Sequence, residues 1–125
     1  DFCVDMGIEH DDRELDYFRS QLVLVSKLAG LDAPVDGVTT AIDNVAVLST
    51  DILRGKRFGF GAKLCIHPKQ VAPVNATYLP QADEIAWARR VMDADGAAVQ
   101  VDGKMVDKSV LIRAQRILSV AQRAG

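Results

Sequence analysis

Three short segments of the chain carry residues whose types and spacing suit chemistry. Residues 59–71 have the sequence GFGAKLCIHPKQV, in which a glycine-containing turn leads into a short apolar strand that ends in polar residues. Residues 1–7 (DFCVDMG) and 101–107 (VDGKMVD) place carboxylates beside further short apolar stretches. In α/β proteins the carboxyl ends of parallel strands face the substrate crevice, and the loops that follow them carry the chemistry. These three segments are therefore the candidates for a ligand-binding site.

The first part of the chain alternates between strands and helices that must position these segments. Apolar residues spaced by three or four predict an amphipathic helix that Gly30 would end. The predicted order is a strand at 2–4, a helix at 12–29, a strand at 33–38, a helix ending near 53, a strand at 62–66 and a helix at 69–75. The N-cap of the second helix is expected at Thr39, Thr40 or Asp43. This order is typical of a right-handed parallel α/β sheet.

The character of the chain changes after Pro80. An amphipathic helix is predicted at 81–95, with Gly96 at its end. A strand pair follows at 99–106 around the turn dipeptide Asp102-Gly103, and a last helix is predicted at 109–121. This part is an appendage to the strand–helix repeat.

Composition bounds the class of protein. The chain has 125 residues, 49% hydrophobic and 26% charged, which predicts one folded globular unit with a core. The net charge of −2 gives no reason to expect nucleic acid or an anionic membrane as partner. No apolar run approaches the ~18 residues that a membrane span needs.

The cysteines and the start of the chain suggest further expectations. Cys3 and Cys65 lie far apart in apolar stretches, so reduced, buried thiols and a cytoplasmic location are expected. The chain begins at Asp1 without an initiator Met, inside a predicted strand, which suggests a piece of a longer protein.

In these segments the chain resembles the citrate lyase beta-subunit-like branch of the HpcH/HpaI aldolase family. Residues 1–7 resemble the family's Asp-Phe strand end, residues 59–71 its last barrel strand, and residues 103–107 its C-terminal extension. The resemblance covers essentially the whole chain but only the carboxyl half of the family. The family's substrate-binding Arg and metal-binding Glu belong to the other half.

The resemblance implies an α/β fold, the carboxyl half of a TIM (β/α)₈ barrel with a C-terminal helical and hairpin extension. Residues 1–79 would form the half barrel, and residues 80–125 would form the extension, serving oligomerisation and covering an active site. A half barrel leaves sheet edges unpaired, so the chain is expected to be inactive alone. Trimers or hexamers fit the family.

The resemblance also implies a magnesium-dependent carbon–carbon lyase. Its substrate would be a 3-hydroxyacyl-CoA such as citryl-CoA, malyl-CoA or citramalyl-CoA, which yields an acyl-CoA and a 2-oxoacid. A pyruvate aldolase of class II that does not use CoA, and an inactive fragment or scaffold, are the alternatives.

Site roles follow from the same resemblance, each beside a structural alternative. Asp1 matches the Mg²⁺ ligand, although an Asp at a strand end is often a cap or a solvated charge. Ile66, His67 and Pro68 match the side of the pocket near the CoA moiety. Asp107 matches a carboxylate that a neighbouring subunit brings to the reacting carbon as general acid or base. It is equally suited to capping the following helix, and the family often has Pro where Ser109 stands.

Other polar residues have weaker claims to a function. Asp36 ends the second predicted strand and faces the catalytic end by topology, although a cap or loop role is as plausible. Lys63 and Lys69 could meet CoA phosphates, but such lysines are usually solvated. The chain shows no nucleophile triad around His67, which favours a positioned imidazole over a base.

Overall fold

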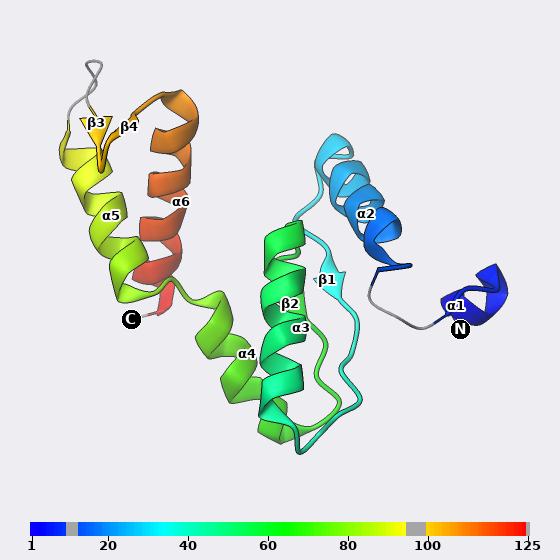
Figure 1. Cartoon of the computed structure of the whole chain (residues 1–125). Helices are drawn as coiled ribbons and strands as arrows, with labels where there is room; N and C mark the ends of the chain where they lie inside the picture. Colours follow the sequence, from blue (N-terminus) through cyan, green and yellow to red (C-terminus); the bar gives the residue numbers. More distant parts are fainter. Residues whose placement is uncertain (10–12, 95–99, 125) are drawn as a thin grey trace. The chain divides into compact units, whose positions relative to one another are not determined.

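The computed structural model describes residues 1–9, 13–94 and 100–124, and it divides the chain into two compact units, residues 1–78 and 79–125 (Figure 1). Unit 1 contains α1 (Phe2–Met6), α2 (Asp16–Leu28), β1 (Val35–Asp36), α3 (Val45–Phe58), β2 (Ala62–Lys63), the short 3₁₀ helix η1 (Pro68–Gln70) and α4 (Val71–Tyr78). Unit 2 contains α5 (Ala82–Asp93), β3 (Gln100–Val101), β4 (Lys104–Met105) and α6 (Lys108–Ala124).

The parallel pairing predicted for unit 1 is confirmed. β1 and β2 pair in parallel with Val35 opposite Ala62 and Asp36 opposite Lys63, and α3 lies between them in sequence. The bond from Leu64 N to Asp36 O, at 3.0 Å, continues the pairing beyond β2. The strands are shorter than the predicted ranges. Since the described residues form this sheet from two strands only, the half barrel stays a prediction.

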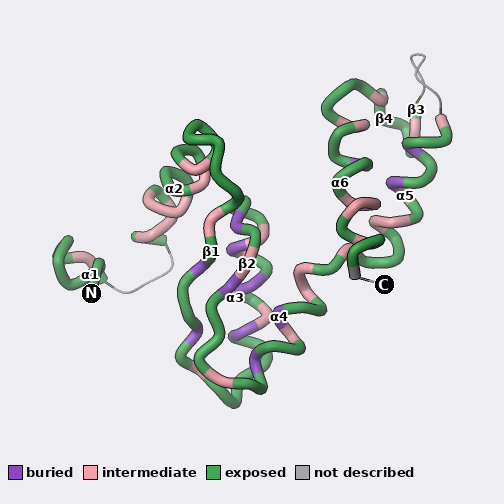
Figure 2. Tube along the Cα trace, turned by 180° about the vertical axis from the view of Figure 1, so that it is seen from behind, coloured by how far each residue is buried: buried purple, intermediate pink, exposed green. Residues whose placement is uncertain are grey.

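The core of unit 1 lies between α3 and α4. Leu48 and Ile52 of α3 pack against Val74 of α4, with Tyr78 at the side of this cluster. Figure 2 shows buried stretches of α3 and α4 in purple. The Tyr78 hydroxyl donates to Ala62 O at 3.1 Å and so ties α4 to β2. Burial, and then the nearby Asp36 carboxylate, raise the pKa of Tyr78, so the phenol stays protonated as a donor.

The helix α3 starts and ends at residues other than those predicted. Its N-cap is Asn44, whose Oδ1 accepts from Val47 N at 3.1 Å, and not Thr39, Thr40 or Asp43. The helix continues to Phe58, because Gly59 is the first residue to adopt a left-handed conformation, with φ 101°.

The strand predicted at residues 2–4 is wrong. These residues lie in α1, where Asp5 N donates to Asp1 O at 2.9 Å and Gly7 ends the turn with φ 64°. In the described part of unit 1 no strand lies beside this segment, so its backbone bonds locally instead of in a sheet ladder. Phe2 packs edge-on against Phe18 of α2, with ring centroids 4.8 Å apart.

A buried carboxylate connects α2 to the strands. Asp36 is 3% exposed and accepts from Arg19 Nη1 at 2.6 Å and from Gly37 N at 2.8 Å. Lys63 Nζ lies 3.7 Å from Asp36 Oδ2. Of the apolar residues of α2, Phe18 is half-buried, but Leu22 and Val25 are more than half accessible. The ion pair with Asp36 is therefore a main attachment of α2.

The two thiols of unit 1 differ in exposure. Cys3 is buried as expected, but Cys65 is exposed because it follows the end of β2 in a loop. Over the described ranges, no helix combines the length and apolar character needed to cross a membrane.

Unit 2 confirms the predicted helix, hairpin and helix. Ala88 and Val91 of α5 pack on Ala114 of α6. Asp102 and Gly103, with φ 52° and 75°, form the turn between the antiparallel strands β3 and β4. The predicted helix end at Gly96 lies outside the described residues.

Gly55 provides a test of the packing around Asp36. A Cβ at this position of α3 would lie 2.6 Å from Asp36 Oδ2, whose carboxylate is held by Arg19. We expect Gly55→Ala to lower the free energy of unfolding by about 1–3 kcal/mol, the usual cost of overpacking. Urea unfolding would measure it. Gly37→Ala is the control, because a Cβ there meets nothing within 4 Å; equal stability of the two variants would contradict the packing.

Candidate functional site

The carboxyl ends of β1 and β2 lie at one edge of the parallel pair and lead into two neighbouring loops. Residues 37–44 follow β1, and residues 64–67 follow β2. Because loops after parallel strands carry ligands in α/β proteins, this edge is the candidate site of unit 1. Ile66, His67 and Pro68 lie in and directly after the second loop.

The segment 66–68 is fixed in backbone but accessible in side chain. His67 is extended, with φ −146°, and its Nδ1 accepts from Lys69 N at 3.2 Å, which starts η1. Pro68 occupies the first position of η1, where its missing N–H costs nothing. Ile66 is 49% exposed, and His67 is half-buried.

The hydrogen bond from Lys69 N to Nδ1 determines which ring nitrogen of the neutral His67 carries the proton. With Nδ1 accepting from a backbone amide, the proton of the neutral imidazole lies on Nε2. His67 can thus donate to an oxygen of a ligand. The role of His67 as a positioned imidazole stays a prediction.

Lys63 is buried and paired, whereas the sequence predicted either a contact with CoA phosphates or a solvated side chain. Its side chain is 3% exposed and donates to Gly37 O at 2.8 Å, so it is unavailable for phosphates. Lys69 is solvated, as expected, and pairs with Asp43 at 2.9 Å on the surface. Asp36 at the end of β1 points into the helix layer towards Gly55, which assigns it a structural role.

Two residues at this edge were missed in the sequence. Arg19 is bound to Asp36, and a signal for it existed, since position 19 falls within the apolar stripe of α2 beside Phe18. Gln70 is buried, with its amide bonded to Ile66 N and Thr39 O. Its burial depends on contacts with residue 39, so local spacing gave no signal.

Asp107 lies in unit 2, at the N-terminus of α6. Its Oδ1 accepts from Ser109 Oγ at 2.6 Å and from Val110 N at 2.9 Å. The Ser109 hydroxyl, followed by the Val110 amide, lowers the pKa of this fully exposed carboxyl below its usual value. The capping alternative is therefore realised in the structure, and Asp107 is an ionised carboxylate at neutral pH.

Asp1 is the N-cap residue of α1, without a side-chain capping bond, and it is exposed. Within the described ranges, no three His, Cys, Asp or Glu side chains converge in a way that could hold a metal ion. Since Mg²⁺ takes several oxygen ligands, the described residues do not form a magnesium site by themselves. Asp1 as a metal ligand stays a prediction.

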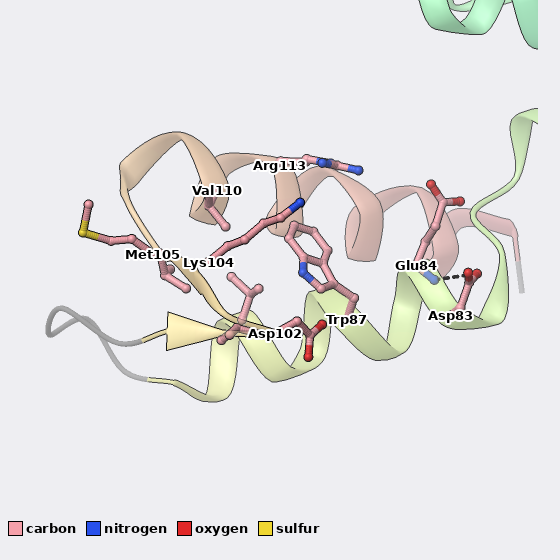
Figure 3. Close-up of a pocket in the computed structure, with 11 residues that line it drawn as sticks. Asp83, Glu84, Trp87, Asp102, Lys104, Met105, Val110 and Arg113 are labelled. Carbon is pink, nitrogen blue, oxygen red and sulfur yellow. Dashed lines mark hydrogen bonds between the residues drawn. The ribbon is translucent and has the colours of Figure 1, made fainter.

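Each unit has a cavity, and none of Asp1, Ile66, His67, Pro68 and Asp107 is among its lining residues. In unit 1, a cavity of about 670 Å³ is lined mainly by apolar residues of α2 and β1, with Arg19 and Asp36 at its wall. In unit 2, a cavity of about 460 Å³ lies between the hairpin and the two helices (Figure 3). At its wall, Cζ of Arg113 lies 4.9 Å from the centroid of the Trp87 ring. Asp107 follows Val106, which lines this second cavity, but does not line it itself.

Titration of Asp107 tests the bond from Ser109. The folded pKa is lowered, so the cap contributes stability above the usual pKa of 3.8, and this contribution is lost as pH falls through the folded value. We expect NMR titration of the carboxyl carbon to give a midpoint below 3.8, and Ser109→Ala to move it upward. Ser119→Ala, elsewhere on α6, is the control. An unchanged midpoint in Ser109→Ala would show that the hydroxyl does not set this pKa.

Comparisons with known proteins relate this geometry to one group of enzymes. A citrate lyase subunit beta-like protein from Deinococcus radiodurans is 35% identical over 95% of this chain, which covers 45% of that protein. The mitochondrial citramalyl-CoA lyase of Homo sapiens is 30% identical over 97% of this chain, which covers 38% of that protein. The chain therefore spans less than half the length of these curated relatives.

A solved structure gives the same relationship. The crystal structure of CitE from Mycobacterium tuberculosis, in complex with magnesium, acetoacetate and coenzyme A, superposes with a TM-score of 0.84 at 30% identity. The match covers 96% of this chain and 48% of CitE. No protein-family model matches the chain. By sequence and by fold, the chain belongs to the citrate lyase beta-like family.

Proposed function

We propose that the chain is part of a carbon–carbon lyase that cleaves, or forms, a 3-hydroxyacyl-CoA thioester. The products of cleavage would be an acyl-CoA and a 2-oxoacid, with citryl-CoA, malyl-CoA and citramalyl-CoA as candidate substrates. The observation that carries the proposal is the TM-score of 0.84 with a protein whose crystal structure contains coenzyme A. The relatives named citrate lyase beta-like protein and citramalyl-CoA lyase support the same class of reaction.

Ile66, His67 and Pro68 would contact the CoA portion of the substrate. They follow the carboxyl end of β2, and their side chains are exposed or half-buried. The Nε2–H of His67 is suited to donate to a carbonyl or phosphate oxygen, because Nδ1 is already bonded to Lys69 N. The fixed backbone of Pro68 limits the entropy that such a contact would lose.

Asp107 would act as a general base that accepts the hydroxyl proton of the substrate at the start of cleavage. Because Ser109 and Val110 lower the pKa of this carboxyl, it would start cleavage as the ionised base. The carboxylate would accept the hydroxyl proton of the substrate, the adjacent carbon–carbon bond would break, and the electron pair would pass to the thioester enolate. Protonation of this enolate then gives the acyl-CoA. In the proposal Asp107 serves a neighbouring chain, within a trimer or hexamer.

The whole protein is proposed to use magnesium, with Asp1 as one ligand. The other ligands would come from outside the described residues, in which no group of three potential ligands converges. A metal ion of this kind acts as a Lewis acid on carbonyl and carboxylate oxygens.

Substrate class separates this proposal from an aldolase that does not use CoA. In a full-length protein carrying this chain, we expect cleavage of citramalyl-CoA or malyl-CoA at least about 10²-fold faster than cleavage of the free acids, since remote binding energy supports catalysis. A coupled assay for the released 2-oxoacid would measure both. Equal rates on thioester and free acid would favour the pyruvate aldolase.

Substitution of Asp107 tests the proton-transfer role apart from the capping role. Asn is as good an N-cap as Asp, so Asp107→Asn keeps the helix end and removes the base. We expect kcat of the full-length enzyme to fall by about 10²-fold or more, the scale of general acid–base catalysis. Asp83→Asn, another exposed acid of unit 2, is the control. Near-normal turnover of Asp107→Asn would leave Asp107 with the cap alone.

A further inference from the structure

Gln70 is buried at the junction of the two loops that follow β1 and β2. It is 1% exposed, and both ends of its side-chain amide are bonded. Oε1 accepts from Ile66 N at 2.9 Å, and Nε2 donates to Thr39 O at 2.9 Å. A buried amide must find partners for its polar atoms, so this arrangement fixes the amide and both backbone groups together.

The Thr39 end of this bridge is itself anchored. Thr39 is 4% exposed, and its hydroxyl donates to Asp51 Oδ2 of α3 at 2.6 Å. The path Ile66–Gln70–Thr39–Asp51 thus runs from the loop after β2, across the loop after β1, to the helix that packs on the core. Gln70 is the buried side chain in this path that bonds to both loops.

We infer that Gln70 is a positioning residue that holds segment 66–68 against the loop after β1 for contact with a CoA thioester. The inference rests on the proposed function for the contact with CoA. The joining of the loops rests on the geometry of the bridge alone. A glutamine suits this place because its amide offers an acceptor and a donor in one plane, one for each loop.

A second connection between the same segments provides a matched control. Lys69 Nζ and Asp43 Oδ1 are 2.9 Å apart, but their side chains are 66% and 80% exposed. Exposed ion pairs contribute little because water competes for both charges. Asp43→Asn should therefore leave the segment in place, whereas Gln70→Leu, of similar volume, should release it.

Amide hydrogen exchange of the 125-residue chain tests the bridge without any ligand. In Gln70→Leu we expect exchange at Ile66 to accelerate by about tenfold or more relative to Ile52 in the core, the scale of one lost hydrogen bond. Asp43→Asn should leave both amides as in wild type. Should Gln70→Leu not fold, Gln70→Glu is the second variant: it loses the donor to Thr39 O and keeps an acceptor for Ile66 N, so exchange at Ile66 should stay as in wild type while CoA binding weakens, and unchanged CoA binding would overturn the inference. Equal acceleration at Ile66 and Ile52 would make the role merely structural and overturn the inference.

The affinity for CoA, followed by NMR titration of the same variants, tests the positioning. We expect Gln70→Leu to weaken CoA binding by about tenfold, with Asp43→Asn unchanged. Unchanged affinity in Gln70→Leu overturns the positioning role. If wild type shows no saturable CoA binding, the proposed CoA contact fails instead, and the exchange at Ile66 still decides whether Gln70 joins the loops.

Discussion

Unit 1 depends on the need to compensate one buried carboxylate. Asp36 lies almost fully buried at the end of β1, and an ionised group there is tolerated only with charge and hydrogen-bond partners. Arg19 supplies a charge from α2, and Lys63 supplies another from β2. Gly55 supplies space, because only a residue without a side chain lets α3 approach the carboxylate. One side chain thus connects a helix to the two strands that build the candidate site.

This arrangement determines which charged groups at the strand ends are available to a ligand. Asp36 and Lys63 are both buried and already have partners, Arg19 and Gly37 N for the carboxylate and Gly37 O for the ammonium, so neither offers a free charge to a ligand. In the proposed function, recognition at this edge belongs to segment 66–68, where an imidazole, an exposed isoleucine and a proline are available. The proposed proton-transfer residue, Asp107, lies at the start of α6, where hydrogen bonds from Ser109 and Val110 lower the pKa of its carboxyl. This division suits a reaction in which one part binds CoA and another moves a proton.

Local sequence patterns predicted the helices and the hairpin better than they predicted which side chains are buried and what those side chains contact. Apolar spacing gave the helices, and the Asp102-Gly103 pair gave the hairpin, because these signals act within a few residues. The burial of Lys63 and Gln70, and the exposure of Cys65, depend on contacts more than twenty residues away or on where a strand ends. Residues 2–4 have the composition of a strand, but a strand also needs a neighbour, and in the described residues this segment closes its bonds as a helix. Of the predicted site residues, Ile66, His67 and Pro68 belong to unit 1 and Asp107 to unit 2, and their roles stay predictions because no spacing within the sequence relates the two units.

The central claim is that segment 66–68 receives the CoA portion of a thioester. The most direct measurement is a titration of the isotope-labelled chain with CoA, followed through backbone amide shifts in NMR. The account predicts saturable shifts that are largest at Ile66, His67 and Lys69, with adenosine alone giving weaker ones because it lacks most of the contacts. Saturable shifts confined to other residues, or none at millimolar CoA, would contradict it.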